Sequence, residues 1–560
     1  MHDLLRSLAH HIAGDECFVG DARAFENKIT SSSSSSLIKL RRLSIVDKKL
    51  ETIPDFIMEQ TSLRTLSFFH TPLIRDLPRD LFRKLRSLRV LNLRETAINN
   101  LPTFLGDLVH LKTLDISNTS IREIPESIGN LRNLQFLLLE NCEYMHNLPN
   151  GVVGLINLRV LDVENVPHDG LPVGIGRLEQ LHSLWGFVAN GSEGCIFGVG
   201  EDDREQEHKG HQHRRFCTLK ELKSLSQLRY LIIQNLERVS NRDEARAATL
   251  KAKPHLLYLD MHWALANNTS EVQQPRANDY EEEDIRRIGE VFEELCPPPC
   301  IEILRINDYF GREFPNWLMT PSSSSFRNLR RLELKNCALY QQIPPLGMLP
   351  QLDYVWINGA SAVLRIGPEF LVLAGGRAGG QKTDSCFSSY FPKLEQLGFK
   401  NMPNWEEWRW QSEEDNRTTS LLPSLKSLGI DRCPKLRSLP ESLLCHATAL
   451  KKLYIAGAHS LREIQNLPSL TELILISNSN LERVSNLPAL KFLRIHHCEK
   501  LKVVEGVDAM EHILLHNREG SLPDWLVGAG EEQSCFPSLH KLTLKNRICR
   551  RGLPDWPLIR

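Results

Sequence analysis

The chain has 560 residues, more than one ordinary hydrophobic core organises, so it forms several domains or an extended array of repeats. Its 68 Lys and Arg residues nearly balance its 69 Asp and Glu residues, which argues against a nucleic-acid coat or a polybasic membrane binder as its main role. We find no signal-peptide pattern and no apolar run of ~18 residues, so we expect no stable membrane insertion. The 13 cysteines are then expected to be reduced thiols.

The opening segment, residues 1–30, carries the pattern of one amphipathic helix. Apolar residues recur on a single helical face between Leu4 and Ala13, and Asp3 precedes them as a cap. The residues that follow supply little against which this face could pack. Six serines at 31–36 come next, and we interpret them as a flexible linker.

The main signal is an internal repeat. Six segments end in Leu-Pro, Ile-Pro or a close variant, and their prolines lie 23 or 24 residues apart, at Pro54, Pro78, Pro102, Pro125, Pro149 and Pro172. In each segment an L-x-x-L-x-L-like run predicts a short strand, and the following residues bring the chain round the outside. No unit has a core of its own, so neighbouring units must stack. The pattern predicts an α/β leucine-rich-repeat solenoid, a horseshoe with a parallel sheet on its concave face, regular over residues 37–189.

Residues 218–560 continue the pattern as irregular repeats. The polar, glycine-containing stretch 190–217 is expected to be a disordered surface loop. An Asn/Asp-capped segment at 240–253 predicts a helix on the convex side, and 266–290 forms an acidic insert that runs from a loop into a helix.

Candidate metal and redox sites are outweighed by structural interpretations. Cys142, Cys337, Cys433 and Cys498 each follow an alternating apolar run, and a repeated position indicates small, buried, structural thiols. His208, His211 and His213 could ligate a metal together with nearby acids, but they lie in the polar loop, and a solvated loop is the favoured interpretation.

Enzymatic motifs were not found. The sequence contains no G-x-x-x-x-G-K-[ST] phosphate loop and no G-x-S-x-G elbow. A repeat solenoid offers a large concave surface for a partner and no natural enclosed cleft. We therefore predict a protein-binding chain that is not an enzyme, holds no cofactor or metal on its own and binds no nucleic acid.

The predicted concave face contains two sets of candidate partner-binding residues. The residue after the first leucine of each regular strand is Arg41, Arg64, Arg89, Lys112, Gln135 and Arg159, mostly basic and about 5 Å apart on adjacent rungs. This column favours an acidic partner, and the alternative is ordinary solvated basic residues. Further along lie the aromatic residues Tyr230, Tyr258, Tyr354, Trp356, Tyr454 and Phe492, which are candidate anchors unless they pack on neighbouring rungs.

A cluster of tryptophans follows one of the later strands. It comprises Trp405, Trp408 and Trp410, and Trp317 and Trp525 take the same post-strand place in their repeats. This recurrence favours a structural cap over the convex side rather than a ligand site.

Several segments resemble one known family. Met1-His2-Asp3-Leu4 resembles the MHD motif of plant nucleotide-binding leucine-rich-repeat disease resistance proteins, and HDLLRSLAHHIAGDECF resembles the winged-helix (ARC2-like) end of their nucleotide-binding region. ERVSNRDEARAATLKAKPHLLYLDMHW, IPPLGMLPQLDYVWINGASAVLRIGPEF and FPKLEQLGFKNMPNWEEW are similar to the repeat half of the coiled-coil class. The chain thus resembles the C-terminal part of such a receptor, with residues 1–30 as the remnant of the nucleotide-binding region.

The resemblance implies a site that this chain cannot complete alone. In a full-length receptor His2, with Asp3 beside it, would contact the phosphates of ADP, and ADP or ATP is the cofactor of the family. The phosphate loop and the Walker B acids would lie upstream, so we expect no nucleotide hydrolysis by this chain and interpret Met1 as an internal methionine of a longer receptor.

The resemblance also implies two roles for the repeats. The N-terminal repeats would hold the nucleotide-binding domain in its inactive state, and the C-terminal repeats would meet a pathogen effector or a guarded host protein. The expected compartment is the cytoplasm, with the nucleus or the inner face of the plasma membrane as further possibilities. The alternative is a free-standing leucine-rich-repeat scaffold for protein–protein interaction, without nucleotide switching.

Overall fold

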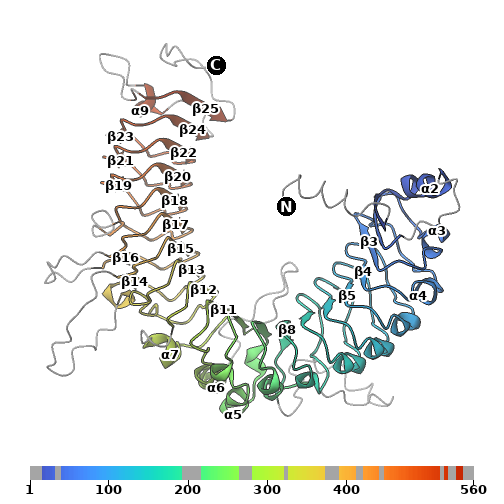
Figure 1. The fold of residues 1–560 in the computed structure, drawn as a ribbon. Coiled ribbons are helices and arrows are strands. Elements are labelled where there is room, and N and C mark those ends of the chain that lie inside the picture. Colours follow the sequence, from blue (N-terminus) through green and yellow to red (C-terminus); the bar gives the residue numbers. More distant parts are fainter. Residues whose placement is uncertain are drawn as a thin grey trace, which may run out of the picture. The chain divides into compact units, whose positions relative to one another are not determined.

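The computed structural model describes residues 16–31, 40–191, 216–263, 281–320, 326–371, 390–410, 421–440, 447–516, 523–527, 536 and 538–545. The chain divides into two compact units, Met1–Gln274 (unit 1) and Pro275–Arg560 (unit 2). In each unit short parallel strands line one side, and helices, turns or other short segments return the chain on the other (Figure 1). We call these two surfaces the sheet face and the return side of a unit.

The sheet of unit 1 is parallel, and its strands pair in chain order. They are β1 (Cys17–Gly20), β2 (Arg42–Val46), β3 (Thr65–Phe69), β4 (Val90–Asn92), β5 (Thr113–Asp115), β6 (Phe136–Leu138), β7 (Val160–Asp162), β8 (Ser183–Val188), β9 (Tyr230–Gln234) and β10 (Tyr258–His262). Because side chains alternate along a strand, Leu91, Leu114 and Leu137 point into the core, where all three are fully buried.

The return side of unit 1 is built from short helices. They are α2 (Ala22–Ser31), α3 (Asp55–Met58), α4 (Leu81–Lys84), η2 (Thr103–Asp107), η3 (Glu126–Asn130), η4 (Asn150–Gly154), η5 (Ile175–Arg177), η7 (Leu219–Ser224), η8 (Leu236–Arg238), α5 (Arg242–Ala247) and η9 (Leu250–Ala252). The repeated proline stands directly before α3, η2, η3 and η4. A proline at that point has no N–H to leave unsatisfied, so it starts a helical turn without cost.

The sheet begins earlier than the sequence predicts. β1 pairs in parallel with β2, and Cys17 lies opposite Arg42. Phe25 of α2 is only 2% exposed, and its ring lies 4.9 Å from that of Phe18 and 5.7 Å from that of Phe56. Residues Cys17–Thr30 therefore pack as the first layer of the solenoid, which differs from the prediction that all of 1–30 form a separate winged-helix remnant. CFVG lacks the leucine pattern, so the repeat pattern does not predict this strand.

Two other predicted segments near the start differ or lie outside the described ranges. Ser31 is the last residue of α2 and not part of a linker, whereas the remaining serines at 32–36 lie outside the described residues. The predicted opening helix between Leu4 and Ala13 also lies outside them.

The predicted helix at 240–253 is divided into two pieces. α5 begins after Asn241, whose side chain accepts a hydrogen bond from the backbone N–H of Glu244 at 3.0 Å, as an N-cap does. The α-helix ends before Thr249, which adopts a left-handed φ of 49°, and the chain continues as the 3-10 helix η9. Of the predicted loop 190–217, residues 192–215 lie outside the described ranges.

The sheet of unit 2 is also parallel. Its strands are β11 (Ile303–Asn307), β12 (Arg331–Lys335), β13 (Tyr354–Asn358), β15 (Gln396–Lys400), β17 (Ser427–Asp431), β18 (Lys452–Ala456), β20 (Glu472–Ile476), β22 (Phe492–His496), β24 (His512–His516) and β25 (Lys541–Lys545). Further short strands pair as β14 (Arg365–Ile366) with β16 (Glu407–Trp408), and as β19 (Glu463–Gln465), β21 (Arg483–Ser485) and β23 (Val503–Glu505).

The helices of unit 2 are few and short, apart from one. They are α6 (Glu282–Glu294), α7 (Asn316–Met319), η11 (Pro368–Phe370) and α9 (Asp524–Val527). α6 covers the end of the predicted acidic insert 266–290 and extends past it, whereas residues 264–280 lie outside the described ranges. No helix in the described ranges is long and apolar enough to cross a lipid bilayer.

The repeated cysteines occupy the structural position that the sequence indicates. Cys142, Cys337 and Cys433 are buried, and the Cys142 thiol lies 3.2 Å from the carbonyl oxygen of Ile116 on the preceding rung. Burial raises the pKa of Cys337 and Cys433 to about 12 and that of Cys498 to about 11. Thiols that stay protonated are poor nucleophiles and poor metal ligands, so these cysteines serve packing.

The three tryptophans of the cluster are core residues. Trp405, Trp408 and Trp410 are at most 3% exposed, and the ring of Trp408 lies 5.3 Å from Trp405 and 5.0 Å from Trp410. Trp317 packs edge-on against Phe292 at 5.3 Å. This packing supports the structural interpretation of the cluster over a ligand site.

Candidate partner-binding surface

The basic residues form a regular column at the start of the strands in unit 1. Each stands directly before its strand, and backbone hydrogen bonds link successive members. The N–H of Arg64 donates to the carbonyl of Arg41 at 2.8 Å, that of Arg89 to Arg64 at 2.7 Å and that of Lys112 to Arg89 at 2.7 Å. We call Arg41, Arg64, Arg89, Lys112, Gln135 and Arg159 the basic column.

The column continues over two positions that the sequence analysis did not name. The N–H of His182 donates to the carbonyl of Arg159 at 2.8 Å, and that of Arg229 donates to His182 at 2.7 Å. Partial burial, and then the charges of Arg229 and Arg159, lower the pKa of His182. Both residues follow the first leucine of a strand, at Leu181 and Leu228, so the same register rule would have found them.

Most of the positive charge of the column is not neutralised in the described part of unit 1. Arg41 lies 3.4 Å from the carboxylate of Glu16. Arg64, Arg89, Lys112 and Arg159 are exposed, and no ion pair joins them to an acid within the described ranges. Like charges on adjacent rungs repel, so an acidic partner surface would be attracted to this edge.

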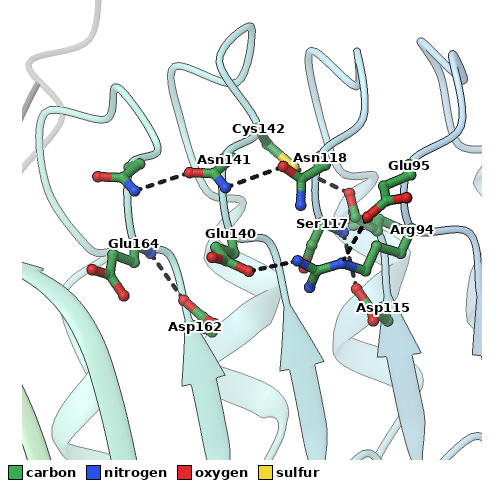
Figure 2. Close-up of polar contacts among 12 residues, drawn as sticks. Arg94, Glu95, Asp115, Ser117, Asn118, Glu140, Asn141, Cys142, Asp162 and Glu164 are labelled. Carbon is green, nitrogen blue, oxygen red and sulfur yellow. Dashed lines mark hydrogen bonds and ion pairs between the residues drawn. The ribbon is translucent and has the colours of Figure 1, made fainter. Parts of the chain in front are cut away.

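The opposite edge of the same strands has a different charge pattern. Arg94 follows β4 and its guanidinium reaches past the rung of Ser117 to Glu140, where the two side chains lie 3.1 Å apart (Figure 2). Glu95 lies 3.7 Å from the same guanidinium. A small side chain at Ser117 lets one arginine span two rungs, so this edge contains its own partner for the positive charge.

Carboxylates close the ends of β5 and β7. Asp115 accepts a hydrogen bond from the backbone N–H of Ser117, and Asp162 accepts one from Glu164, each at 3.0 Å (Figure 2). Burial, together with the nearby carboxylates of Glu164 and Glu140, raises the pKa of Asp162 to about 7. The sheet face of unit 1 therefore has cations where these strands start and mostly carboxylates where they end. The repeat pattern did not predict this second edge.

The predicted aromatic residues lie on the sheet faces. In unit 1 the rings of Tyr230 and Tyr258 lie 6.1 Å apart on the paired strands β9 and β10. In unit 2 the Phe492 ring packs edge-on against His512 at 5.1 Å, and the guanidinium of Arg331 lies 5.8 Å from the Tyr354 ring.

The register brings Trp356 and Tyr454 into one row of unit 2. Trp356 lies opposite Gly398, Gly398 opposite Gly429, and Gly429 opposite Tyr454. Tyr454 is 36% exposed. Tyr354 lies in the neighbouring row and Phe492 several strands away, so the four candidate aromatic residues of unit 2 do not form one cluster.

The strand starts of unit 2 carry charges of both signs. The equivalent positions are Glu302, Arg330, Asp353, Glu395, Lys426, Lys451, Thr471, Lys491, Glu511 and His540, and we call them the mixed column. Arg330 pairs with Asp353 at 2.7 Å, Lys426 with Glu395 at 2.6 Å and Lys491 with Glu511 at 2.8 Å. Unlike the basic column, the mixed column largely neutralises itself.

The residues implied for nucleotide and metal binding stay untested. His2 and Asp3 lie outside the described residues, as do His208, His211 and His213. Within the described ranges, no group of three or more His, Cys, Asp and Glu side chains is arranged to hold a metal ion.

The repeats, the parallel sheets and the column geometry define a leucine-rich-repeat protein. Residues 41–146 match the model of a leucine-rich repeat region, and residues 219–360 match the model of R13L1/DRL21 LRRs. The chain is 34% identical over 454 residues to the putative disease resistance protein At3g14460 of Arabidopsis thaliana, a match that covers 79% of this chain and 28% of that protein.

A second relative is also a putative disease resistance protein. The putative disease resistance protein RGA4 of Solanum bulbocastanum is 31% identical over 452 residues, 80% of this chain and 38% of that protein. A solved structure of a TDR receptor aligns with a TM-score of 0.42 at 15% identity, over 94% of this chain and 78% of that chain. The curated relatives are plant disease resistance proteins, which confirms the resemblance, and the chain spans less than two fifths of the length of the two relatives described here.

Proposed function

We propose that this chain is the leucine-rich-repeat part of a plant innate immune receptor. In this proposal unit 1 holds an attached nucleotide-binding domain in its inactive state, and unit 2 recognises a pathogen effector or a guarded host protein. The chain works by binding protein surfaces and does no chemistry of its own. ADP or ATP would be held by the attached domain, with His2 and Asp3 contributing only there, and the receptor would act in the cytoplasm, the nucleus or at the inner face of the plasma membrane.

The observation that carries the proposal is the basic column. Exposed arginines and a lysine on adjacent rungs lack an ion-pair partner within the described part of unit 1. Side chains of one sign at a spacing of about 5 Å raise the free energy of the isolated surface, and an acidic partner surface removes that penalty when it docks. An acidic patch on the attached domain fits this requirement.

The test is charge reversal in a receptor that contains both parts. Arg64→Glu and Arg89→Glu, introduced together into a full-length receptor expressed in plant leaf cells, should release the restraint and raise cell-death signalling without any effector. Arg122→Glu with Arg132→Glu is the matched control, since both residues are exposed and neither belongs to the basic column. Arg122 lies between β5 and η3, and Arg132 lies between η3 and β6. Equal background for the two double variants would overturn the role of the basic column.

Transcript mapping decides which receptor to build. The 5′ end of the mRNA and the size of the native protein, detected with an antibody against the repeats, should reveal a product well above 64 kDa with a phosphate loop upstream. A 64 kDa product that begins at Met1 would contradict the attached domain and leave a protein-binding scaffold.

A further inference from the structure

The row that contains Trp356 and Tyr454 lacks side chains on the two strands between them. Gly398 of β15 and Gly429 of β17 lie opposite each other and face the same side of the sheet as Trp356. Neither glycine has a positive φ, so the backbone does not require glycine at either position. Glycine weakens a strand, and its presence there often marks a place where another group approaches the backbone closely.

For Gly398 the approaching group is part of the protein. A methyl group at Gly398 would lie 2.0 Å from Cε3 of Trp356 and 2.1 Å from Cζ3, so the indole ring covers this residue directly. Trp356 therefore lies along the sheet toward β17 instead of projecting straight from β13. The need for glycine at this position is fully explained by the indole.

For Gly429 the described structure supplies no such group. A methyl group there would have one heavy atom of another residue within 4 Å, Cζ3 of Trp356 at 3.9 Å, which is an ordinary contact. We call the open space above Gly429 the gap. The Cζ3 edge of the Trp356 indole borders it on one side, and Tyr454 stands on the next strand on the other side. Strands lie about 4.8 Å apart, so a side chain that enters above Gly429 from outside would stand beside the side chains of the two neighbouring strands.

The charges around the gap favour a partner segment with acidic residues next to the side chain that enters above Gly429. Most nearby charges are paired, with Lys400 lying 3.1 Å from Asp431 and Lys452 lying 2.8 Å from Glu472. Lys451 before β18 and Arg432 after β17 are exposed, and within the described ranges neither pairs with an acid. Because one lies at the start of these strands and the other at the end, the gap has a cation on each side.

We infer that Gly429, between Trp356 and Tyr454, receives an aromatic side chain from a protein segment with acidic residues on both sides of it. A planar ring above Gly429 meets the edge of the indole on one side and the Tyr454 phenol on the other, and the flanking carboxylates meet Lys451 and Arg432. This inference rests on the proposed function only in taking the sheet face of unit 2 as the recognition surface.

The test uses the 560-residue chain and three fluorescein-labelled peptides, followed by fluorescence anisotropy. Ac-EEGWGEE-NH2 should bind at least tenfold more tightly than Ac-EEGAGEE-NH2, which lacks the ring, and than Ac-KKGWGKK-NH2, which reverses the charges. Equal binding of the alanine peptide would contradict the binding of an aromatic side chain at Gly429. Equal binding of the lysine peptide would contradict the preference for acidic residues on both sides of it.

Variants place the binding at the gap. Gly429→Val fills the space and should weaken the tryptophan peptide at least tenfold. Ser44→Val places the same side chain in the middle of β2 in unit 1 and should change nothing, so it is the control. Gly429→Ala fits the backbone and reports whether loss of binding reflects filling of the gap and not misfolding. Unchanged binding by Gly429→Val would refute the site.

The outcome is separable from that of the proposed function. The peptide measurement depends on unit 2 alone, and the charge-reversal assay depends on unit 1. Failure of the peptides with raised background signalling in the Arg64 and Arg89 variant would remove this inference and keep the receptor assignment.

Discussion

The two units carry different charge patterns at the same strand-start position. In unit 1 the basic column places Arg64, Arg89 and Lys112 on consecutive rungs without an acid between them. In unit 2 the mixed column alternates in sign often enough that Lys426 and Lys491 each have a carboxylate partner within 3 Å. The backbone geometry is the same in both, so the difference comes from side-chain choice alone.

This difference separates a surface that is complete in itself from one that is not. Two unit charges 5 Å apart in water repel by about 0.8 kcal/mol before screening by salt. The mixed column converts such contacts into weak attractions, whereas the basic column retains them. Surface charge of one sign adds little to folding stability, so it is the part of unit 1 most readily explained by an external partner.

The largest expected effect concerns whether the two units respond separately. Leu137 of β6 and Leu473 of β20 are fully buried, so Leu137→Ala and Leu473→Ala should each lower the free energy of unfolding by about 2–5 kcal/mol. Repeats are coupled mainly to their neighbours, so hydrogen exchange should show lost protection around the altered strand. Gln135→Ala, directly before β6 and outside the core, is the control. Equal loss throughout both units from either variant would contradict separate units.

The next effect concerns the carboxylate edge of unit 1. The pKa of Asp162 is about 7 in the folded chain and near 3.8 when unfolded, so the folded state holds the extra proton between these values. Stability should therefore fall as pH rises from 4 to 7 and stay level above that. Asp162→Asn should remove this decline and raise the free energy of unfolding at pH 8 by on the order of 2 kcal/mol. One pKa unit corresponds to about 1.4 kcal/mol, and we expect less than the full shift because neighbouring carboxylates share it.

Thermal unfolding of both proteins at pH 5 and pH 8 checks this effect. The asparagine is a matched replacement, because Asn92 ends β4 and accepts the backbone N–H of Arg94 at 2.9 Å, just as Asp162 accepts that of Glu164. Identical pH profiles for Asp162→Asn and the parent chain would show that Asp162 is not the titrating group.

A smaller effect on the free energy of unfolding is expected in the turns that follow the strands, and it should differ between the two units. Asn118, Asn141 and Asn165 adopt φ of 56–57° and join side chain to side chain at 3.1 and 2.9 Å (Figure 2). Asn141→Ala should cost about 1–2 kcal/mol, because it loses two hydrogen bonds and strains a left-handed backbone. Asn141→Gly should cost less than Asn141→Ala. Glycine also loses the two hydrogen bonds, but it adopts the left-handed backbone without strain.

Unit 2 offers the complementary variant for those turns. Gly457 after β18 has φ of 63° and no side chain in any ladder, so Gly457→Ala should cost about 1 kcal/mol through strain alone. Urea denaturation measures both series. A Gly457→Ala cost larger than that of Asn141→Ala would show that the ladder hydrogen bonds add nothing.

The smallest effect tests the charge columns directly. Arg64→Gln with Arg89→Gln should stabilise the chain slightly at 20 mM salt by removing repulsion, whereas Glu395→Gln should destabilise it slightly by removing a partner of Lys426. Both changes should be below about 0.5 kcal/mol and vanish at 500 mM salt. Calorimetric melting temperatures at the two salt concentrations check the signs. The same sign for both variants would remove the distinction between the columns.

The repeat pattern was sufficient to predict the fold because its information is local. Each L-x-x-L-x-L-like run specifies both a strand and the side that it buries, so Leu91, Leu114 and Leu137 could be assigned to the core without coordinates. The same register placed Arg64, Arg89 and Lys112 on one edge. The strand Cys17–Gly20 was not predicted, because these four residues lack the leucine pattern and form a strand only through pairing with β2.

By itself the sequence determined the class of fold, the core positions and the place of each candidate residue along a rung, since these follow from periodicity. Only the tertiary structure decided which charges are paired, because ion pairs such as Lys426–Glu395 join residues 31 positions apart. It also decided that Trp356 lies over Gly398 and leaves Gly429 open, since the direction of an indole ring depends on neighbouring strands. Stacking brings distant segments within contact distance, and no local pattern encodes those contacts.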